Sequence, residues 1–142
     1  METHMTQTLN AHLKKNLRRS IMRGESWVYK EALQLKNGKP HKATLCSVYD
    51  KSGKDLGWGF FDPHSPIAVR LLGVGSARPP KNFLALKLHA AWKLRENLPK
   101  TTGFRMVNGE GDLMPGLVVD IYGPLAVIQL DGPGPTEFWD TD

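Results

Sequence analysis

The chain has 142 residues, of which 40% are hydrophobic, and its formal net charge is +5. That hydrophobic fraction is enough for a packed core and excludes disorder throughout, and the length fits one ordinary domain or a small domain plus part of a second. The sequence has no run of 18 apolar residues and no apolar segment near its start, so it predicts neither a membrane span nor a secretory signal, and its single cysteine, Cys46, excludes an internal disulfide.

The first predicted element is a basic helix that ends before Gly24. Leu9, Leu13, Leu17 and Ile21 recur every four residues, which is the spacing of one stripe on a helix. Glycine commonly stands just past the C-terminus of a helix. Five cations occupy the other faces of this predicted helix: Lys14, Lys15, Arg18, Arg19 and Arg23. The sequence therefore predicts one helix that presents a basic surface.

Short strands separated by turns are expected next. They cover residues 26–33, 43–50, 55–62 and 67–75. The segment KSGK, residues 51–54, predicts the turn of a hairpin. Gly57 and Gly59 predict a bulge or a close backbone approach within a strand. Several short strands at this spacing favour a small barrel or sandwich.

The second half of the chain predicts a helix and then a three-stranded meander. Residues 76–82 are a linker, because two adjacent prolines stop a strand. A helix is expected over residues 82–98, and its apolar stripe consists of Phe83, Leu86, Ala90, Leu94 and Leu98. The meander is expected over residues 104–109, 116–123 and 124–132. The segment after it, PGPTEFWDTD, shows no clear structure. Three strands with one uncovered face are marginal alone, so residues 101–142 are predicted to be an incomplete domain.

Three stretches carry a resemblance to a known family. They are NLRRSIMRGESWVYKEAL (16–33), VYDKSGKDLGWGFFDPHSPIAVRLL (48–72) and RMVNGEGDLMPGLVVDIYG (105–123). In order and spacing they resemble the N-terminal region of bacterial class I SAM-dependent methyltransferases that modify cytosine C5 in large-subunit rRNA. The likeness covers roughly residues 12–133, which is most of the chain. One departure is Glu25, where the family usually has His or a similar residue.

The resemblance implies a fold and a division of the chain. The fold class is α+β, with a small PUA-like β-barrel and helices, followed by an incomplete α/β connecting domain made of a helix and a β-meander. The expected segments are residues 1–75 for the RNA-binding barrel, 76–100 for the linker and helix, and 101–142 for the incomplete domain with an acidic tail. The catalytic domain that binds SAM is expected beyond residue 142. The chain alone is therefore predicted to bind ribosomal RNA, to hold no cofactor and to catalyse nothing.

The distribution of charge agrees with an RNA partner. Residues 1–100 hold 18 Lys/Arg and 7 Asp/Glu, a net +11, whereas residues 101–142 hold 1 and 7, a net −6. Several cations are needed to bind successive phosphates, and exposed aromatic rings stack on unpaired bases. Alternation places Trp27 and Tyr29 on one strand face. The predicted RNA-binding residues are Lys14, Lys15, Arg18, Arg19, Arg23, Trp27 and Tyr29. Arg70, Lys51 and Lys54 would extend this surface. For Trp27 itself the favoured interpretation is an anchor of the barrel core, because large aromatics usually dominate small cores, and base stacking is the alternative.

Other reactive residues predict structure rather than catalysis. Cys46 lies in an apolar strand, where a buried thiol is inert. Glu110 and Asp112 are interpreted as part of a solvated turn, since no His or Cys accompanies them as metal ligands. His64 is interpreted as a turn residue. The segment GVGSAR, residues 73–78, lacks the third glycine and the helix of a cofactor-binding turn. No catalytic, cofactor or metal site is predicted, and the missing signal and disulfide favour a cytoplasmic setting.

Three further hypotheses remain open at this point. The unfinished sheet at residues 104–132 would present an open edge, so the chain could be a protein-interaction or dimerisation module. The natural product could continue past Asp142 and be an intact methyltransferase. The opposite charges of the two halves also predict that the acidic tail folds back on the basic helix.

Overall fold

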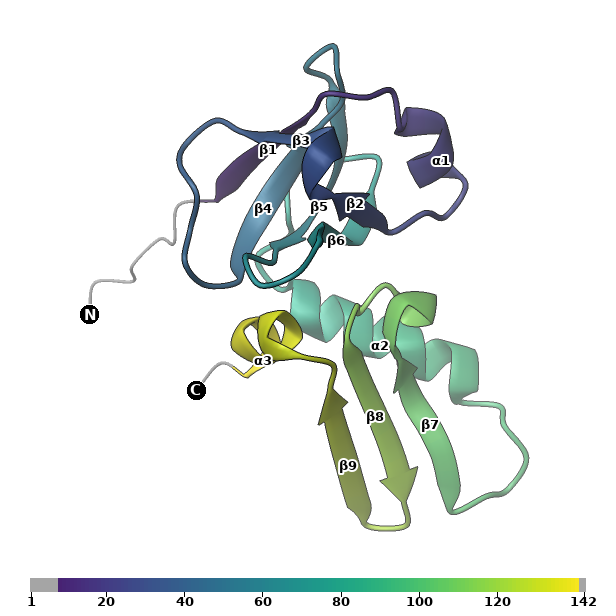
Figure 1. Cartoon of the computed structure of the whole chain (residues 1–142). Helices are drawn as coiled ribbons and strands as arrows, with labels where there is room; N and C mark the ends of the chain where they lie inside the picture. Colours follow the sequence, from purple (N-terminus) through teal and green to yellow (C-terminus); the bar gives the residue numbers. More distant parts are fainter. Residues whose placement is uncertain (1–7, 141–142) are drawn as a thin grey trace.

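The computed structural model describes residues 8–140, which form a curled six-stranded sheet and a separate three-stranded sheet with three α-helices (Figure 1). Residues 1–7 and 141–142, at the outer ends of the predicted first and last segments, lie outside the described residues. The first part contains β1 (Leu9–Leu13), α1 (Arg18–Met22), β2 (Trp27–Tyr29), the 3-10 helix η1 (Lys30–Ala32), β3 (Leu33–Leu35), β4 (Thr44–Tyr49), β5 (Asp55–Phe61) and β6 (Ile67–Val74). The second part contains α2 (Phe83–Arg95), β7 (Gly103–Asn108), the 3-10 helix η2 (Gly109–Asp112), β8 (Leu117–Tyr122), β9 (Leu125–Leu130) and α3 (Pro133–Trp139).

The six-stranded sheet curls because its two edge strands are neighbours in sequence. Its strand order is β2-β6-β5-β4-β1-β3, so β2 and β3 lie at opposite edges, yet only η1 joins them. A three-residue link cannot span a flat sheet of six strands, which lie about 4.8 Å apart. The sheet must therefore bend until its edges approach each other, which gives the barrel-like shape that the sequence predicts.

The interior of the curled sheet is apolar and contains the residue that sequence analysis expected to be inert. Cys46, Val48, Val28, Val69 and Leu71 are fully buried there. Burial raises the pKa of the Cys46 thiol to about 12. The prediction of a structural cysteine is therefore confirmed.

The glycines in β5 behave as predicted. The register of β5 against β6 shifts between Trp58 and Gly59. A Cβ atom on Gly59 would run into the backbone carbonyl of Arg70 on β6. Only glycine permits this approach of the two strands.

The prediction of a helix beginning near Leu9 is wrong. Residues Leu9–Leu13 form a strand in which Leu9, Ala11 and Leu13 are buried, and α1 begins only at Arg18. A spacing of four residues fits a helical stripe, but it also fits alternation in a strand, where every second residue faces the same side. Ala11 completes the alternating pattern. The predicted end of the helix is confirmed, because Gly24 adopts φ +111° just past α1.

The helix α2 forms as expected but buries a different face. Leu86 and Leu94 of the predicted stripe are 49% and 76% exposed, whereas Ala91 is buried. Lys87 and Arg95 lie on the packed face, where Lys87 donates to the carbonyl of Leu72 and Arg95 donates to that of Arg105. Because backbone carbonyls accept hydrogen bonds from Lys87 and Arg95, both cations can lie on the packed face of α2. That face therefore differs from the apolar stripe that the sequence predicts.

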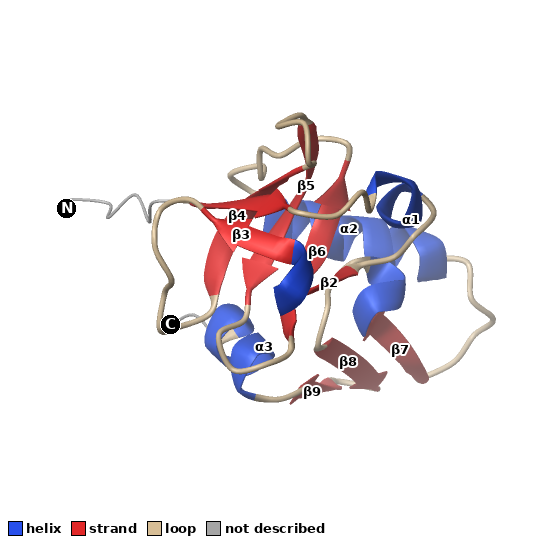
Figure 2. Cartoon of the chain, turned by 45° about the horizontal axis from the view of Figure 1, so that its top comes forward, coloured by secondary structure: helices blue, strands red, loops and turns tan. Residues whose placement is uncertain are grey.

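The helix α3 joins the two sheets, although its sequence showed no clear structure. Phe138 stacks on Phe60 of the curled sheet with ring centroids 4.4 Å apart, and the Nε1–H of Trp139 donates to the carbonyl of Pro115 at 2.8 Å. Figures 1 and 2 show α3 beside both the curled sheet and the end of β9. Glu137 of α3 bonds to the backbone N–H of Ala43 and to His64. The described part of the acidic tail therefore lies against these residues and not over α1.

Candidate nucleic-acid interface

The five predicted cations lie on a loop and a short helix rather than on one long helix. Lys14 and Lys15 follow β1, Arg18 and Arg19 open α1, and Arg23 caps its end. Four of these side chains are exposed, and that of Arg18 is half-buried. The segment thus keeps its basic surface, although Lys14 and Lys15 are not helical.

Arg18 makes side-chain hydrogen bonds that the other four cations do not make within residues 8–140. Its Nε–H donates to Asp50 at 2.8 Å and its Nη2–H donates to the carbonyl of Asp55 at 2.7 Å. Hydrogen bonds from the Ser52 hydroxyl, the Lys54 backbone and Arg18 hold the pKa of Asp50 well below its usual range. Arg18 therefore fastens α1 to the turn between β4 and β5.

A basic hollow lies beside these Arg18 hydrogen bonds. It has a volume of about 520 Å³ and is lined by Asn16, Arg18, Asp50, Lys51, Ser52 and Lys54. Lys51 and Lys54, which sequence analysis assigned to the edge of the basic surface, are thus brought next to Arg18.

Trp27 and Tyr29 are exposed on one face of β2, as alternation predicts. Their exposed fractions are 41% and 45%, whereas Val28 between them is fully buried. The favoured expectation that Trp27 anchors the barrel core is therefore wrong. The core position belongs to Val28.

The Trp27 ring is held in place by two partners. Its Nε1–H donates to Glu110 Oε1 at 3.2 Å. The guanidinium carbon of Arg70, the cross-strand neighbour of Trp27, lies 6.0 Å from the ring centroid. An exposed tryptophan is thus fixed by a residue from the second part of the chain.

Arg70 is a buried cation that lies between two carboxylates. Its side chain is 9% exposed, and its nitrogens lie 3.8 Å from Asp62 and 3.6 Å from Glu110. These separations are longer than hydrogen bonds, and within residues 8–140 the Nε atom of Arg70 has no hydrogen-bond partner. The positive charge of Arg70, next to the Trp27 ring, therefore attracts Glu110 to this end of the curled sheet.

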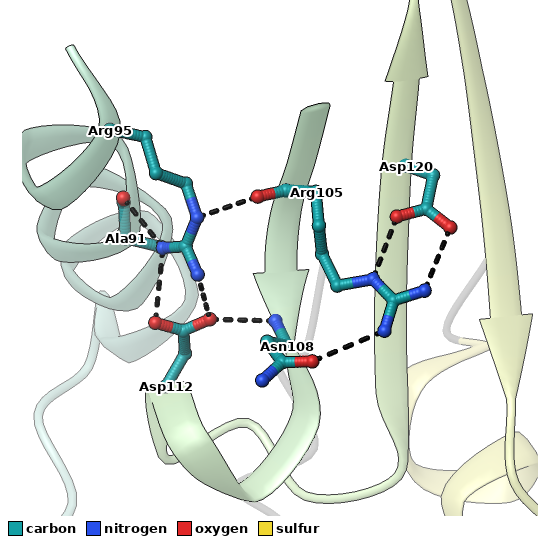
Figure 3. Close-up of polar contacts among 6 residues, drawn as sticks. All are labelled: Ala91, Arg95, Arg105, Asn108, Asp112 and Asp120. Carbon is teal, nitrogen blue, oxygen red and sulfur yellow. Dashed lines mark hydrogen bonds and ion pairs between the residues drawn. The ribbon is translucent and has the colours of Figure 1, made fainter. Parts of the chain in front are cut away.

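Hydrogen bonds from α2 and β7 hold the carboxylate of Asp112 (Figure 3). Asp112 accepts two hydrogen bonds from Arg95, at 3.1 and 2.8 Å, and one from the backbone N–H of Asn108 at 2.6 Å. Its side chain is 4% exposed. The interpretation of this segment as a solvated turn is wrong for Asp112, because Arg95 of α2 takes the carboxylate into the fold. The network fixes η2, and η2 carries Glu110.

Two hollows meet at Trp27. The larger, of about 530 Å³, is lined by residues 20 and 23–27 together with Glu110. The smaller, of about 180 Å³, includes Lys15 and Tyr29. Of the predicted residues, the structure brings Arg23 to the first hollow and Lys15 and Tyr29 to the second, whereas Lys14 and Arg19 line neither. Sequence reasoning missed Glu110 as a neighbour of Trp27, because no local pattern links residues 83 positions apart.

The remaining candidate residues do not form a reactive centre in the part of the chain that the structure describes. His64 lies in the turn before β6, as predicted, and its Nε2 lies 3.0 Å from Glu137. Residues 76–82 contain no helix or strand, which agrees with a linker. Between residues 8 and 140, no three His, Cys, Asp or Glu side chains are grouped as a metal would require. Over the same residues, none of the helices has the length and apolar character to cross a membrane.

Comparison with known families defines the class of the first part. Residues 11–73 match the family described as a PUA-like domain. This range covers the curled sheet and α1 almost completely. The barrel-like fold with its short basic helix is therefore similar to a PUA-like domain.

The curated relatives extend the likeness into the second part. The chain is 35% identical over 118 residues to a ribosomal RNA large subunit methyltransferase of Deinococcus radiodurans, covering 78% of this chain and 29% of the relative. It is 33% identical over 120 residues to ribosomal RNA large subunit methyltransferase I of Alteromonas mediterranea, covering 82% of this chain and 30% of the relative. The chain thus spans about a third of the length of the relatives it matches.

Solved structures share the fold of both parts. A protein of Streptococcus mutans described as a candidate SAM-dependent methyltransferase superposes with a TM-score of 0.67 at 14% identity, covering 94% of this chain and 35% of that chain. A candidate methyltransferase solved with S-adenosylhomocysteine superposes with a TM-score of 0.66 at 16% identity, covering 88% and 33%. At these identities the likeness shows the fold, which includes the arrangement of the two sheets.

Proposed function

We propose that this chain is the RNA-binding portion of a SAM-dependent rRNA methyltransferase. The observation that carries the proposal is the exposed basic surface of Lys14, Lys15, Arg19 and Arg23 beside exposed Trp27 and Tyr29, on a PUA-like domain. The similarity to rRNA methyltransferases makes ribosomal RNA the proposed partner. Methyl transfer and SAM binding are assigned to sequence outside these 142 residues, since the relatives are about three times as long.

The finer parts of the proposal follow the family resemblance. The target atom is cytosine C5 of large-subunit rRNA, and the setting is the cytoplasm. Residues 1–75 are the RNA-binding barrel, residues 76–100 the linker and helix, and residues 101–142 the start of a connecting domain. In the described residues, α3 and η2 hold that segment against the barrel.

The proposed binding mechanism is electrostatic and shape-dependent. Exposed Lys and Arg side chains displace the counterions condensed on the RNA backbone, which makes the affinity depend on salt. Trp27 and Tyr29 offer rings on which unpaired bases stack. Arg18 contributes charge to the same surface, but its hydrogen bonds to Asp50 and Asp55 also support α1.

Replacing Arg19 and Arg23 together by Ala tests this surface without disturbing the Arg18 contacts. We expect weaker binding to a large-subunit rRNA transcript. The slope of log K against the logarithm of the salt concentration should become shallower by about 1–2, because up to two phosphate contacts are lost. The measurement is an affinity titration at several salt concentrations. The matched control is the double variant Lys81→Ala/Lys100→Ala, which removes the same charge from exposed positions elsewhere. Equal affinity and slope in both double variants would contradict the proposal.

A second candidate function is favoured by the outer strand of the three-stranded sheet. Leu125, Val127 and Ile128 of β9 are 67%, 46% and 63% exposed, and in the described part of the chain β9 pairs only with β8. An apolar strand at an open edge is suited to pairing with another protein or a second copy. Light scattering after size exclusion separates the two functions, because a monomer that binds RNA opposes this candidate.

A further inference from the structure

We propose that the larger hollow at Trp27 binds one unpaired RNA nucleotide, with the base stacked on Trp27 and its edge donating a hydrogen bond to Glu110. The inference rests on the proposed RNA-binding function and adds a base-selective site to it. The site is composite, because Trp27 belongs to the PUA-like domain and Glu110 belongs to η2 in the second part of the chain.

The size of the hollow suits a single nucleotide. Its volume of about 530 Å³ lies within the range of about 300–1,000 Å³ that is typical of small-molecule sites. A base paired in a duplex presents no free ring face to a tryptophan, whereas an unpaired base does. The hollow is therefore suited to a nucleotide that leaves the stack.

The Trp27 ring is organised for stacking before any ligand arrives. The bond to Glu110 and the adjacent Arg70 guanidinium restrict its rotation, although 41% of the residue is exposed. Exposed side chains normally lose rotamer freedom on binding, and a ring that is already fixed loses less. Stabilising an exposed ring through a residue 83 positions away is unnecessary for the core, which Val28 fills.

The carboxylate of Glu110 determines which part of the nucleotide can lie next to it. Its Oε1 accepts from Trp27 and lies near Arg70. An ionised carboxylate only accepts hydrogen bonds, so it repels phosphate and selects a base that offers donors. Glu25 adds a second carboxylate to the lining, whereas Arg23 is the cation there. The phosphate is therefore expected near Arg23 and the base near Glu110.

The same chemistry predicts a preference among bases. Cytosine presents an exocyclic amino group, which is a donor that Glu accepts from readily. Uracil presents carbonyl oxygens on both sides of its single N–H, and these oxygens face a carboxylate unfavourably. We therefore expect cytosine to be preferred over uracil at this site.

The test uses the full chain and three five-unit strands labelled for fluorescence anisotropy: oligo-C, oligo-U and an abasic ribose-phosphate pentamer that carries no bases. The native chain should bind oligo-C several-fold more tightly than oligo-U and about tenfold more tightly than the abasic strand. Trp27→Ala should lose about tenfold in affinity for oligo-C and little for the abasic strand. The control is Trp92→Ala, because Trp92 is similarly exposed, at 44%, and lines neither hollow at Trp27.

Two further variants separate base recognition from folding. Trp27→Phe keeps a stacking ring but loses the Nε1–H donor, so it should retain most of the affinity that Trp27→Ala loses. Glu110→Gln should remove most of the preference for cytosine over uracil, since an amide both donates and accepts. It should also raise the affinity for the abasic strand slightly, because the variant lacks the carboxylate that repels phosphate.

The outcomes distinguish this inference from the proposed function. If neither the pentamers nor an rRNA transcript binds at low salt, the RNA-binding function itself is wrong. If RNA binds but the abasic strand and oligo-C bind equally, or Trp27→Ala matches Trp92→Ala, the nucleotide site is wrong and the phosphate-binding surface remains.

Discussion

The Asp112 carboxylate shows how one residue outside a site can position another within it. It lies in η2, two residues after Glu110, and its hydrogen bonds reach Arg95 on α2 and the end of β7. With the Arg95–Asp112 contact (Figure 3), η2 is fixed relative to α2. The Glu110 side chain of η2 then reaches Trp27. The sequence predicted no such role for Asp112, because its partner is 17 positions away on another element.

Replacing Asp112 by Asn should lower the free energy of unfolding by about 3 kcal/mol, because it removes the charge that compensates a partly buried Arg95. Urea denaturation measures this change. Asp120→Asn is the matched control, since Asp120 of β8 pairs with Arg105 of β7 at a more exposed position. The Asp120→Asn variant should lose clearly less free energy of unfolding, because its ion pair is more exposed. Equal losses in the two variants would show that the Asp112 network is not special.

Trp27 illustrates the limit of residue-level prediction. Alternation correctly placed Trp27 and Tyr29 on one face of β2 and Val28 on the other. It does not say which face is the interior, and size alone favours a tryptophan in the core. The exposed position follows from Glu110 and Arg70, which a reading of local sequence does not connect to Trp27.

At the scale of elements, turn residues predicted the hairpin and the meander well, whereas the single strand expected over residues 26–33 is divided into β2, η1 and β3. Apolar spacing predicted the α2 helix but not its buried face. The hairpin of β4 and β5 and the meander of β7 to β9 lie within one or two residues of their predicted bounds, because Gly, Asn and Pro mark the turns between them. The β1 strand was mistaken for a helix because a four-residue repeat fits both periods. The α3 helix was missed because its two prolines and one glycine lower helix propensity.

Packing explains why α3 forms despite its composition. Pro133 stands at the first position of the helix, where its fixed φ is tolerated. A Cβ atom on Gly134 would collide with the carboxylate of Asp62, so the glycine lets α3 lie close to this side chain. Tertiary contacts thus decide the structure of a segment whose local propensity is low.

Replacing Phe138 by Ala should lower the free energy of unfolding by about 2 kcal/mol, because a half-buried ring leaves its contacts with Phe60 and Phe83. The amides of β5 should also exchange faster with solvent, which hydrogen exchange measures. Phe104→Ala is the control, since Phe104 is also half-buried but lies near Trp92 and away from the curled sheet. Unchanged exchange in β5 after Phe138→Ala would contradict the joining role of α3.

At the scale of the whole molecule, carboxylates stabilise the fold at neutral pH. The backbone N–H of Ala43 is the main cause that lowers the pKa of Glu137 below its ordinary value of 4.5, and Arg105 lowers the pKa of Asp120 below 3.8. A carboxylate whose pKa is lower in the folded state than in the unfolded state stabilises the fold above its unfolded value. That stability is lost as the pH falls through the folded value.

We therefore expect the urea midpoint to fall slightly below pH 6.5, because burial lowers the pKa of His12 in the folded state, and then to fall further below pH 4.5 and 3.8. Urea titrations at successive pH values measure this dependence. The variant Glu137→Gln should show a shallower decline near pH 4, because its side chain does not titrate. A midpoint that rises on acidification would have the wrong sign for these carboxylates.

The distance along the chain between Trp27 and Glu110 has a consequence for synthesis. A ribosome that adds about 5–20 residues per second needs roughly 4 to 17 s to extend the chain by the 83 residues between them. During that interval the nascent PUA-like domain already carries its cations, but its tryptophan lacks the carboxylate that orients it. Under the proposed function, the newborn polypeptide would therefore bind RNA through its cations alone at first and would discriminate among nucleotides only later in its translation.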